Sequence, residues 1–368
     1  MNKILFLIRD LGHGGAEKVL VNLVNHMDRD KFDITVMTLF DEGVNKQFLA
    51  PHIKYKTCFK KSFPANSHFL KLLSASFLHK HFIKVTYDIE IAYLEGPSAR
   101  VISGCQNTAT KLVSWIHVEQ LNVNNAAKAF RNYYESKNSY VAFNKIICVS
   151  NSVKLDFLNL FPELDADILY NTNESKIIQL LSNESINDRF DNSEINLIGV
   201  GKILKNKGFD RLARIHCKLR KKGYNIHTYI LGIGDQEQSI SDYIKSENEV
   251  GSFSFLGYNT NPYKYVKNAD LFVCASYAEG FSTAATEALI VGTPVCTVEV
   301  AGMKEMLGEN NEYGIVTENC EESLYEGIKS LLDNPDLLKH YKEKAIERGK
   351  FFSTEKTVKA VEDMLLNL

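Results

Sequence analysis

The chain has 368 residues, of which 45% are hydrophobic and 24% charged, and its formal net charge is −2. This length favours two domains over a single hydrophobic core, and the near-neutral charge argues against a dedicated nucleic-acid binder. The seven cysteines are scattered without a CxxC pair, which predicts reduced core residues in a cytoplasmic protein. The first apolar run is too short for a signal peptide, and no run approaches the ~18 apolar residues of a membrane span.

Short apolar runs alternate with amphipathic stretches along the chain. Helical patterns cover 16–27, 207–222 and 321–333. Strands are predicted at 3–8, 32–39, 89–94, 111–117, 145–150, 195–201, 226–232, 253–257, 271–276 and 294–300. This alternation predicts an α/β protein with parallel sheets covered by helices on both faces.

A polar stretch without strong strands, 171–194, marks the expected domain boundary. The prediction is two α/β domains, 1–172 and 173–350, that face each other across a cleft. Ligands of such sheets bind outside the carboxyl ends of the strands, so the loops after the strands are the candidate site.

The loop after the first strand contains Gly12, Gly14 and Gly15 just before a helix. Glycines let the backbone approach a ligand closely, and a helix N-terminus attracts anions. The spacing differs from that of a dinucleotide-binding loop, and an ordinary tight turn explains it equally well.

Two cations, Lys202 and Lys207, follow the strand 195–201, and Gly208 then precedes a helix. Lysines beside a helix start suit a diphosphate, although the spacing is not that of a Walker A loop. Lysines in a solvated loop are the alternative. Gly257 and Tyr258 end a further strand, where simple turn chemistry is also sufficient.

The segment "EGFSTAATEALIVGTPV", 279–295, places two carboxylates eight positions apart at a strand-to-helix junction. Gly280 permits a sharp turn, and Ser282 or Thr283 can cap the helix. Carboxylates accept hydrogen bonds from paired sugar hydroxyls, so Glu279 and Glu287 could hold two sugars on either side of a diphosphate. A favourable helix-dipole charge explains Glu279 alone but leaves Glu287 unexplained.

Two weaker candidates also lie at strand ends. His117 closes the strand 111–117, where it is either catalytic or structural. The "DAD" at 165–167 resembles the paired aspartates of metal-dependent sugar transferases, but solvated acids fit its surroundings better. The sequence shows no convincing metal-ligand spacing.

Taken together, these loops resemble the retaining GT-B glycosyltransferases of family four (glycosyl transferases group 1), bacterial enzymes that build polysaccharides and glycolipids. The resemblance covers most of the chain and is weakest between 40 and 110. Its most specific element is the E-x7-E motif at 279–287 with its trailing "GTPV". "GGAEKVL", "ICVSNSV", "GVGKILKNKGFDRL", "FLGYN" and "AGMKEMLGENNEYGIV" match in order and spacing.

The resemblance implies two Rossmann-like domains, an acceptor side at 1–172 and a nucleotide-sugar-binding domain at 173–350, with a C-terminal helix, 351–368, packing back across the junction. Glu279 and His117 would contact the donor sugar, and Glu287 the ribose. Amides around Gly280, Phe281, Ser282 and Thr283 would meet the sugar and β-phosphate, and the backbone near Tyr258 the base. Lys202, Lys207, Gly14 and Gly15 would contact the diphosphate. Lys202 stands where the family usually has arginine, so the bidentate fork is lost.

The expected activity is transfer of a hexosyl unit from a nucleotide sugar, a UDP-sugar above others, to a saccharide or lipid-linked saccharide acceptor in cell-surface polysaccharide synthesis. Retention of configuration, no metal and no further cofactor are expected. The alternatives are a GT-B nucleotide-sugar epimerase and a non-catalytic sugar-nucleotide-binding module. Donor, acceptor, linkage and oligomeric state do not follow from the sequence.

Eight lysines and no acidic residue lie between Glu42 and Asp88, and the run 69–85 spaces apolar residues as a helix does. A basic amphipathic face suits an anionic lipid surface. We therefore expect a cytoplasmic protein that meets the inner face of the cell membrane peripherally. A solvated helix packed on the domain core is the alternative.

Overall fold

The computed structural model describes residues 1–12, 14–63, 70–186 and 193–368, and it divides the chain into two compact units. Unit 1 comprises Met1–Asn173 together with Thr354–Leu368, and unit 2 is Glu174–Ser353. The expected boundary at 172/173 lies one residue from this division. The C-terminal helix begins at Thr354 and belongs to unit 1.

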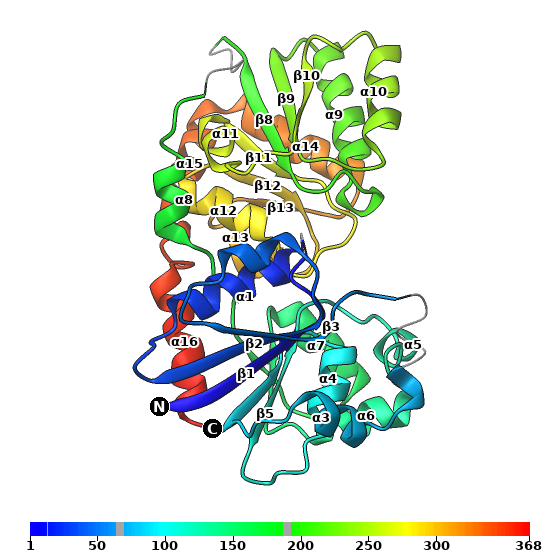
Figure 1. Ribbon diagram of the computed structural model, residues 1–368. Coiled ribbons are helices and arrows are strands. Elements are labelled where there is room, and N and C mark those ends of the chain that lie inside the picture. The colour runs from blue at the N-terminus through cyan, green and yellow to red at the C-terminus, as the bar shows by residue number, and fades with distance from the viewer. Residues whose placement is uncertain (13, 64–69, 187–192) are drawn as a thin grey trace. The chain divides into compact units, whose positions relative to one another are not determined.

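Unit 1 contains a seven-stranded parallel sheet with the order β3-β2-β1-β4-β5-β6-β7 (Figure 1). Its strands are β1 (Asn2–Ile8), β2 (Phe32–Phe40), β3 (Lys54–Phe59), β4 (Ile89–Ala92), β5 (Lys111–Ile116), β6 (Lys145–Cys148) and β7 (Asp167–Ile168). The central strands are buried on both faces, because helices cover both sides of the sheet.

The helices of unit 1 form two groups. Helix α1 contacts α16, whereas α4 contacts both α3 and α6. The described helices are α1 (Gly15–His26), η1 (Val44–Phe48), α3 (Ala75–Phe82), α4 (Pro97–Ile102), α5 (Val123–Ala126), α6 (Tyr133–Val141), α7 (Asn151–Leu160) and α16 (Thr354–Leu366).

Unit 2 contains a six-stranded parallel sheet with the order β10-β9-β8-β11-β12-β13. Its strands are β8 (Ile195–Val200), β9 (Ile226–Leu231), β10 (Phe253–Gly257), β11 (Leu271–Cys274), β12 (Val295–Val298) and β13 (Ile315–Thr317). Its helices are α8 (Ser175–Leu181), η2 (Lys205–Lys207), α9 (Phe209–Lys221), α10 (Glu237–Ser246), α11 (Tyr263–Asn268), α12 (Thr283–Val291), α13 (Met303–Leu307), α14 (Glu321–Asp333) and α15 (Pro335–Gly349).

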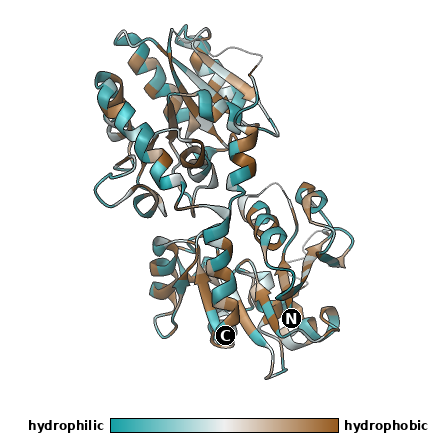
Figure 2. Ribbon diagram, turned by 90° about the vertical axis from the view of Figure 1, so that its left-hand side faces the viewer, coloured by the Kyte–Doolittle hydropathy of each residue, from teal (hydrophilic) through white to brown (hydrophobic). Residues whose placement is uncertain are grey.

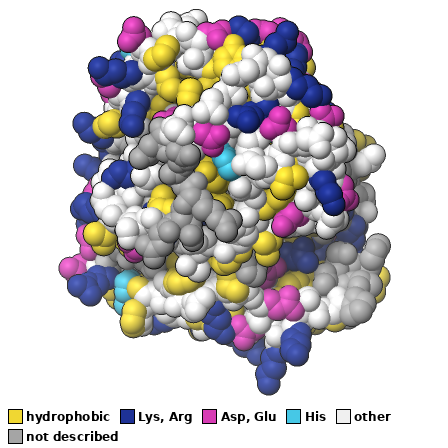
Figure 3. Space-filling model, turned by 90° about the horizontal axis from the view of Figure 1, so that it is seen from above, with side chains coloured by type: hydrophobic (Ala, Val, Ile, Leu, Met, Phe, Trp, Pro, Cys, Tyr) yellow, Lys and Arg dark blue, Asp and Glu magenta, His cyan; other side chains and the backbone are white. Residues whose placement is uncertain are grey.

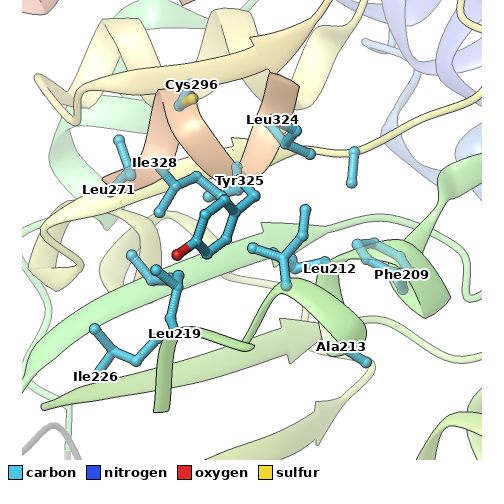
Figure 4. Close-up of a cluster of buried hydrophobic side chains, with 14 of the residues drawn as sticks. Phe209, Leu212, Ala213, Leu219, Ile226, Leu271, Cys296, Leu324, Tyr325 and Ile328 are labelled. Carbon is cyan, nitrogen blue, oxygen red and sulfur yellow. The ribbon is translucent and has the colours of Figure 1, made fainter. Parts of the chain in front are cut away.

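The core of unit 2 lies between its sheet and the helices α9, α10 and α14. Leu212 of α9 and Tyr325 and Ile328 of α14 point toward one another over the sheet (Figure 4). Apolar colour follows the strands, and the helices alternate between polar and apolar residues (Figure 2). Burial of these apolar faces holds the helices against the sheet. This packing sets the positions of the strand ends, from which the loops of the candidate site begin.

The predicted strands and helices are confirmed, with ends that shift by a few residues. The exception is the run 69–85, which the sequence presents as one amphipathic helix. Residues 73–74 interrupt it, and Ser74 caps a separate helix, α3, by accepting a hydrogen bond from the amide of Phe77 at 3.2 Å. The side chain of Ser74 thus competes with continuation of the helix.

Candidate active site

The strand order of unit 2 reverses direction between β8 and β11, which pair directly at Leu197–Leu271 and Ile198–Phe272. The loops after two strands at such a switch point lead away to opposite sides and leave a crevice at the carboxyl end of the sheet. The loop after β8 carries Lys202 and Lys207, and the loop after β11 carries Glu279. The chain therefore brings the candidate cations and the first candidate carboxylate to the same edge.

Lys207 and Glu279 are in direct contact. Lys207 Nζ lies 2.6 Å from Glu279 Oε1, and the two side chains are 26% and 12% exposed. The buried hydroxyl of Ser276 donates a second hydrogen bond to the same oxygen at 2.8 Å. Two donors thus fix the Glu279 carboxylate, which is one of the two donor-site acids expected from the sequence.

Gly208 lets the lysine loop approach the β11 loop. Its φ of +67° is left-handed, and a Cβ at this position would lie 1.9 Å from the carbonyl oxygen of Ala275. The amide of Tyr277 also donates to the carbonyl of Asn206 at 2.8 Å. The side chain of Lys207 then passes Gly201, where a Cβ would be 3.8 Å from Lys207 Cε.

A second layer behind this contact was not predicted from the sequence. The buried guanidinium of Arg211 lies 4.1 Å from the centre of the Tyr277 ring and donates to Asn319 at 2.9 Å. The Asn319 side-chain amide donates to the carbonyl of Tyr277 at 3.3 Å. These contacts hold Tyr277 beside Ser276. The sequence offered one signal for this layer, namely an arginine within the amphipathic helix predicted at 207–222.

The junction before α12 has the predicted cap. The hydroxyl of Ser282 accepts a hydrogen bond from the amide of Ala285 at 3.3 Å, and α12 starts at Thr283. The other first-turn amides of a helix have no partner within the helix and attract anions. Phe281 is buried, and Gly302 approaches it so closely that a Cβ there would lie 2.5 Å from its ring.

Glu287 is the fifth residue of α12, about one turn from its start, and is buried. Its Oε1 lies 3.5 Å from the hydroxyl of Tyr263 on α11, a residue that was not identified from the sequence. Tyr258, after β10, is mostly exposed. Lys202 is exposed too, whereas Lys207, in the same loop, contacts Glu279.

In unit 1, Gly14 and Gly15 lie at the start of α1 after the switch-point strand β1. A Cβ on Gly14 would lie 2.0 Å from Oε2 of Glu17, so the carboxylate of Glu17 folds back over this glycine. An acidic group therefore lies at the helix N-terminus where the sequence predicted a diphosphate contact. The same charge stabilises the helix dipole.

His117 follows β5 and is buried against Tyr93, with the two ring centres 4.9 Å apart. Burial lowers the pKa of His117 to about 3, with a hydrogen bond to the backbone of Tyr93 opposing the shift, so the ring is neutral near pH 7. Among the described residues its Nε2 has no hydrogen-bond partner. A buried imidazole nitrogen of this kind is suited to a ligand hydroxyl.

Glu95 holds His117 from the end of β4, the strand paired with β1 at the switch point. Its Oε2 accepts a hydrogen bond from the backbone amide of His117 at 2.9 Å. Burial raises the pKa of Glu95. This carboxylate was missed from the sequence, although its position after an apolar strand was a usable signal.

The "DAD" segment has a structural role. Asp167 lies in β7 and forms an ion pair with Lys145 of the neighbouring strand, and Asp165 accepts from the amide of Ala166 at 2.8 Å. This agrees with the interpretation of these residues as ordinary acids. On the face of the molecule that Figure 3 shows, basic and acidic side chains are interspersed.

Comparison with known proteins identifies related chains. The family model "Glycosyl transferases group 1" matches residues 179–348, most of unit 2. A Campylobacter jejuni protein named N-acetylgalactosamine-N,N'-diacetylbacillosaminyl-diphospho-undecaprenol 4-alpha-N-acetylgalactosaminyltransferase is 27% identical over 97% of both chains. The capsular polysaccharide biosynthesis glycosyltransferase CapM of Staphylococcus aureus is 30% identical over 41% of this chain and 39% of its own.

Among solved structures, Anabaena HepE in complex with UDP and glucose covers all of both chains with a TM-score of 0.76 and 17% identity. At this identity the likeness concerns the fold. It agrees with the two parallel-sheet units and with the GT-B architecture expected from the motifs.

Proposed function

We propose that this chain, a glycosyltransferase whose residues 179–348 match the family model of the glycosyl transferases group 1, moves a hexosyl unit from a UDP-sugar to a lipid-linked saccharide, with retention of configuration. The observation that carries this proposal is the contact of Lys207 and Ser276 with Glu279 at the switch point of unit 2. It places a cation and a carboxylate together at the carboxyl end of one sheet, in the loops that precede α9 and α12.

These groups have the chemistry that a nucleotide sugar requires. An ammonium group has three N–H donors, so Lys207 can contact Glu279 and a phosphate oxygen together. The N-terminus of α12 offers further donors for phosphate or sugar oxygens. The Glu279 carboxylate can accept hydrogen bonds from sugar hydroxyls, and we assign Glu287 of α12 to the ribose.

The proposed step exchanges one bond at the anomeric carbon for another. The bond from that carbon to the diphosphate oxygen breaks, and a bond to the acceptor oxygen forms on the same face. The acceptor proton passes to a phosphate oxygen of the leaving UDP. The rate then depends on positioning and on stabilisation of the developing diphosphate charge, for which Lys207, Lys202 and the α12 amides are the candidates.

The related proteins support the proposed classes of donor and acceptor. HepE was solved with UDP and glucose, which supports UDP as the nucleotide. The Campylobacter enzyme is named for a diphospho-undecaprenol acceptor and aligns with almost the whole chain, which supports a lipid-linked saccharide. We propose that the reaction needs no metal, since lysine and helix amides supply the positive potential.

The experiment is a nucleotide-release assay with a panel of UDP- and GDP-sugars, with and without bacterial lipid extract and with EDTA present. The proposal predicts UDP release from one sugar and a severalfold increase on addition of lipid. Conversion of the sugar without transfer would indicate an epimerase. Exclusive use of a GDP-sugar would contradict the assigned donor.

We also propose that unit 1 meets an anionic membrane surface through the described part of its basic segment, residues 46–63 and 70–84. No helix among the described residues is long and apolar enough to cross a membrane. Two of the eight lysines are neutralised by acids of β2 and the loop after it, because Lys46 and Lys54 lie 2.6 Å from Asp41 and Asp33. Asp33 and Asp41 lie outside the acid-free segment of the sequence, so their contacts with these lysines were not predicted.

The remaining part of the basic segment combines charge with exposed apolar side chains. Leu72 is 78% exposed and Phe77 on α3 is 52% exposed. Five further lysines are exposed and one is half-buried: Lys56, Lys60, Lys61, Lys80 and Lys84, and Lys71. Basic side chains beside exposed apolar ones suit an interface with anionic lipid, where each cation contributes about 1 kcal/mol.

Vesicle flotation tests this contact, with phosphatidylglycerol and phosphatidylethanolamine as the lipids. Changing Lys60, Lys61, Lys71, Lys80 and Lys84 to glutamate should abolish flotation. A matched variant reverses five exposed lysines elsewhere, Lys222, Lys245, Lys339, Lys342 and Lys359, and should still float. Equal flotation of both variants and the wild type would contradict the proposal.

A further inference from the structure

Three side chains with metal-binding atoms meet in unit 1, away from the candidate active site. His79 on α3, Glu90 near the start of β4 and Cys105 after α4 have ligand atoms that all lie within 4.8 Å of one another. His79 Nε2 and Glu90 Oε2 are 2.7 Å apart. Glu95 and His117 instead follow the ends of β4 and β5.

The local fold brings these residues together through close backbone contact. A Cβ on Gly104 would lie 2.1 Å from the carbonyl oxygen of Ala75, so only glycine lets the chain after α4 touch the start of α3. The buried guanidinium of Arg100 donates to the carbonyls of Leu70 and Leu73, each at 2.7 Å, and fixes the chain before α3.

The burial of Glu90 needs a chemical explanation. Glu90 is 2% exposed and the His79 side chain 12%, although a buried carboxylate is unfavourable unless it is paired. The imidazole of His79 contacts one oxygen of this carboxylate, Oε2. Cys105, whose pKa is raised by burial and then by Glu90, lies on the same side, where a thiol does not balance the negative charge.

A divalent cation would balance this site. Imidazole nitrogen, carboxylate oxygen and thiolate sulfur form a mixed donor set that Zn²⁺ accepts, usually in tetrahedral geometry with a water as fourth ligand when the protein supplies three. Ligands at about 2.0–2.3 Å from such an ion lie roughly 3.3–3.8 Å apart. The present separations need only small side-chain movements to reach that geometry.

We propose that His79, Glu90 and Cys105 bind one Zn²⁺ ion, which fixes α3 and the chain after α4 to strand β4. The role is structural and independent of the transfer reaction. Binding would release the thiol proton of Cys105 to solvent. The sequence did not suggest this site because its three ligands are spaced 11 and 15 positions apart on different elements.

Cobalt binding to the full-length reduced protein tests the proposal, because Co²⁺ replaces Zn²⁺ and a thiolate ligand gives a near-ultraviolet charge-transfer band. The wild type should bind about one Co²⁺ per chain with this band, and added Zn²⁺ should remove it. Cys105→Ser should lose the band, whereas the matched variant Cys58→Ser, another partly buried cysteine of unit 1, should keep it.

The second ligand is tested by His79→Gln, which should weaken Co²⁺ binding about 100-fold. Circular dichroism confirms that each variant is folded. A plain His79–Glu90 ion pair predicts no band in the wild type at excess Co²⁺, and that result would overturn the proposal. A band that survives in Cys105→Ser would overturn it equally.

Discussion

Lys207 and Ser276 fix the position of the Glu279 carboxylate, because both donate a hydrogen bond to the same oxygen, at 2.6 and 2.8 Å. The carboxylate is therefore held in one orientation, and the ammonium group of Lys207 is fixed beside it. Charge-assisted hydrogen bonds of this kind are among the stronger polar contacts in proteins. The arrangement preorganises both groups for a ligand that carries hydroxyls and phosphates.

Substitution of Glu279 by glutamine tests whether the charge of this side chain, rather than its size, is needed for activity. Glu279→Gln keeps the size of the side chain but removes the acceptor charge for sugar hydroxyls and for Lys207. We expect kcat/KM for the donor sugar to fall about 100-fold, in the range found for loss of a preorganised polar group. Steady-state nucleotide release measures this.

The matched control for that change is Glu299→Gln, since Glu299 is an exposed acid that pairs with Lys304 in the same unit. It should retain wild-type kcat/KM. Activity of Glu279→Gln within threefold of the wild type would contradict the role assigned to this carboxylate.

Buried histidines predict how stability depends on pH. Burial lowers the pKa of His216 to about 3, and this side chain bonds Thr228 and Ser252 at 2.9 Å each. Below pH 6.5 the unfolded chain binds a proton that the folded chain excludes, so stability falls as pH falls. The expected slope is about 1.4 kcal/mol per pH unit for such a histidine.

Denaturant unfolding of unit 2 between pH 7 and pH 5 measures that slope. His216→Gln can keep a hydrogen bond but cannot titrate, so its stability should vary less with pH than that of the wild type. An identical pH dependence in the two proteins would show that His216 does not cause it.

At the residue scale, sequence reasoning identified the groups that end strands and missed those that support them. Glu279, Lys207 and Ser282 follow apolar strands in recognisable loops, and the structure brings Lys207 to Glu279. Arg211 of α9 supports the site through contacts with Tyr277 and Asn319, which are distant from it in sequence. No spacing in one chain reveals such contacts.

The loop from β8 to α9 is shaped by Gly208. Its left-handed backbone costs an alanine about 1–2 kcal/mol, and a Cβ would also collide with the Ala275 carbonyl 1.9 Å away. Gly208→Ala should therefore lower both stability and activity, because relief of the collision displaces Lys207. Thermal unfolding and nucleotide release together measure the two effects.

Gly223 provides a control with the same backbone strain but without the collision. Its φ is +91°, and apart from its chain neighbours no described atom lies within 4 Å of the place that a Cβ would take. Gly223→Ala should lower stability by a similar amount, about 1–2 kcal/mol, while activity is retained. Equal activity in both variants would show that the fit of the Gly208 loop against the loop after β11 does not matter for turnover.

At the element scale, the sequence predicted the buried strands and the edge strand β10, but it missed two other edge strands. β3 and β13 were missed, and both lie at the edges of their sheets. β3 carries the exposed lysines Lys54 and Lys56, which mask its apolar alternation. Charged residues on an edge strand hinder pairing with other chains, so the missing apolar signal has a physical cause.

At the scale of the whole molecule, the chain passes between the units twice, at 173/174 and at 353/354. The two ends of unit 1 at these points lie side by side. The Thr354 hydroxyl donates to the carbonyl of Asn173 at 2.6 Å, and these two residues border the connections. Helix α16 then packs on α1, and Glu362 accepts from the amide of Asp28 at 2.6 Å. Alternating strands and helices predicted two domains, but the return of α16 to unit 1 depends on contacts across more than 300 residues of sequence.

Lys207, as the group that stabilises the leaving diphosphate, is the residue on which the proposed mechanism depends most. Its neighbour Lys205 lies in the same turn but pairs with Asp210 at 2.7 Å and is largely exposed. The most direct measurement compares turnover of Lys207→Ala and Lys205→Ala with the preferred nucleotide sugar. We predict that Lys207→Ala lowers kcat about 100-fold or more, whereas Lys205→Ala stays within about threefold of the wild type. Equal turnover of the two variants would contradict the proposed mechanism.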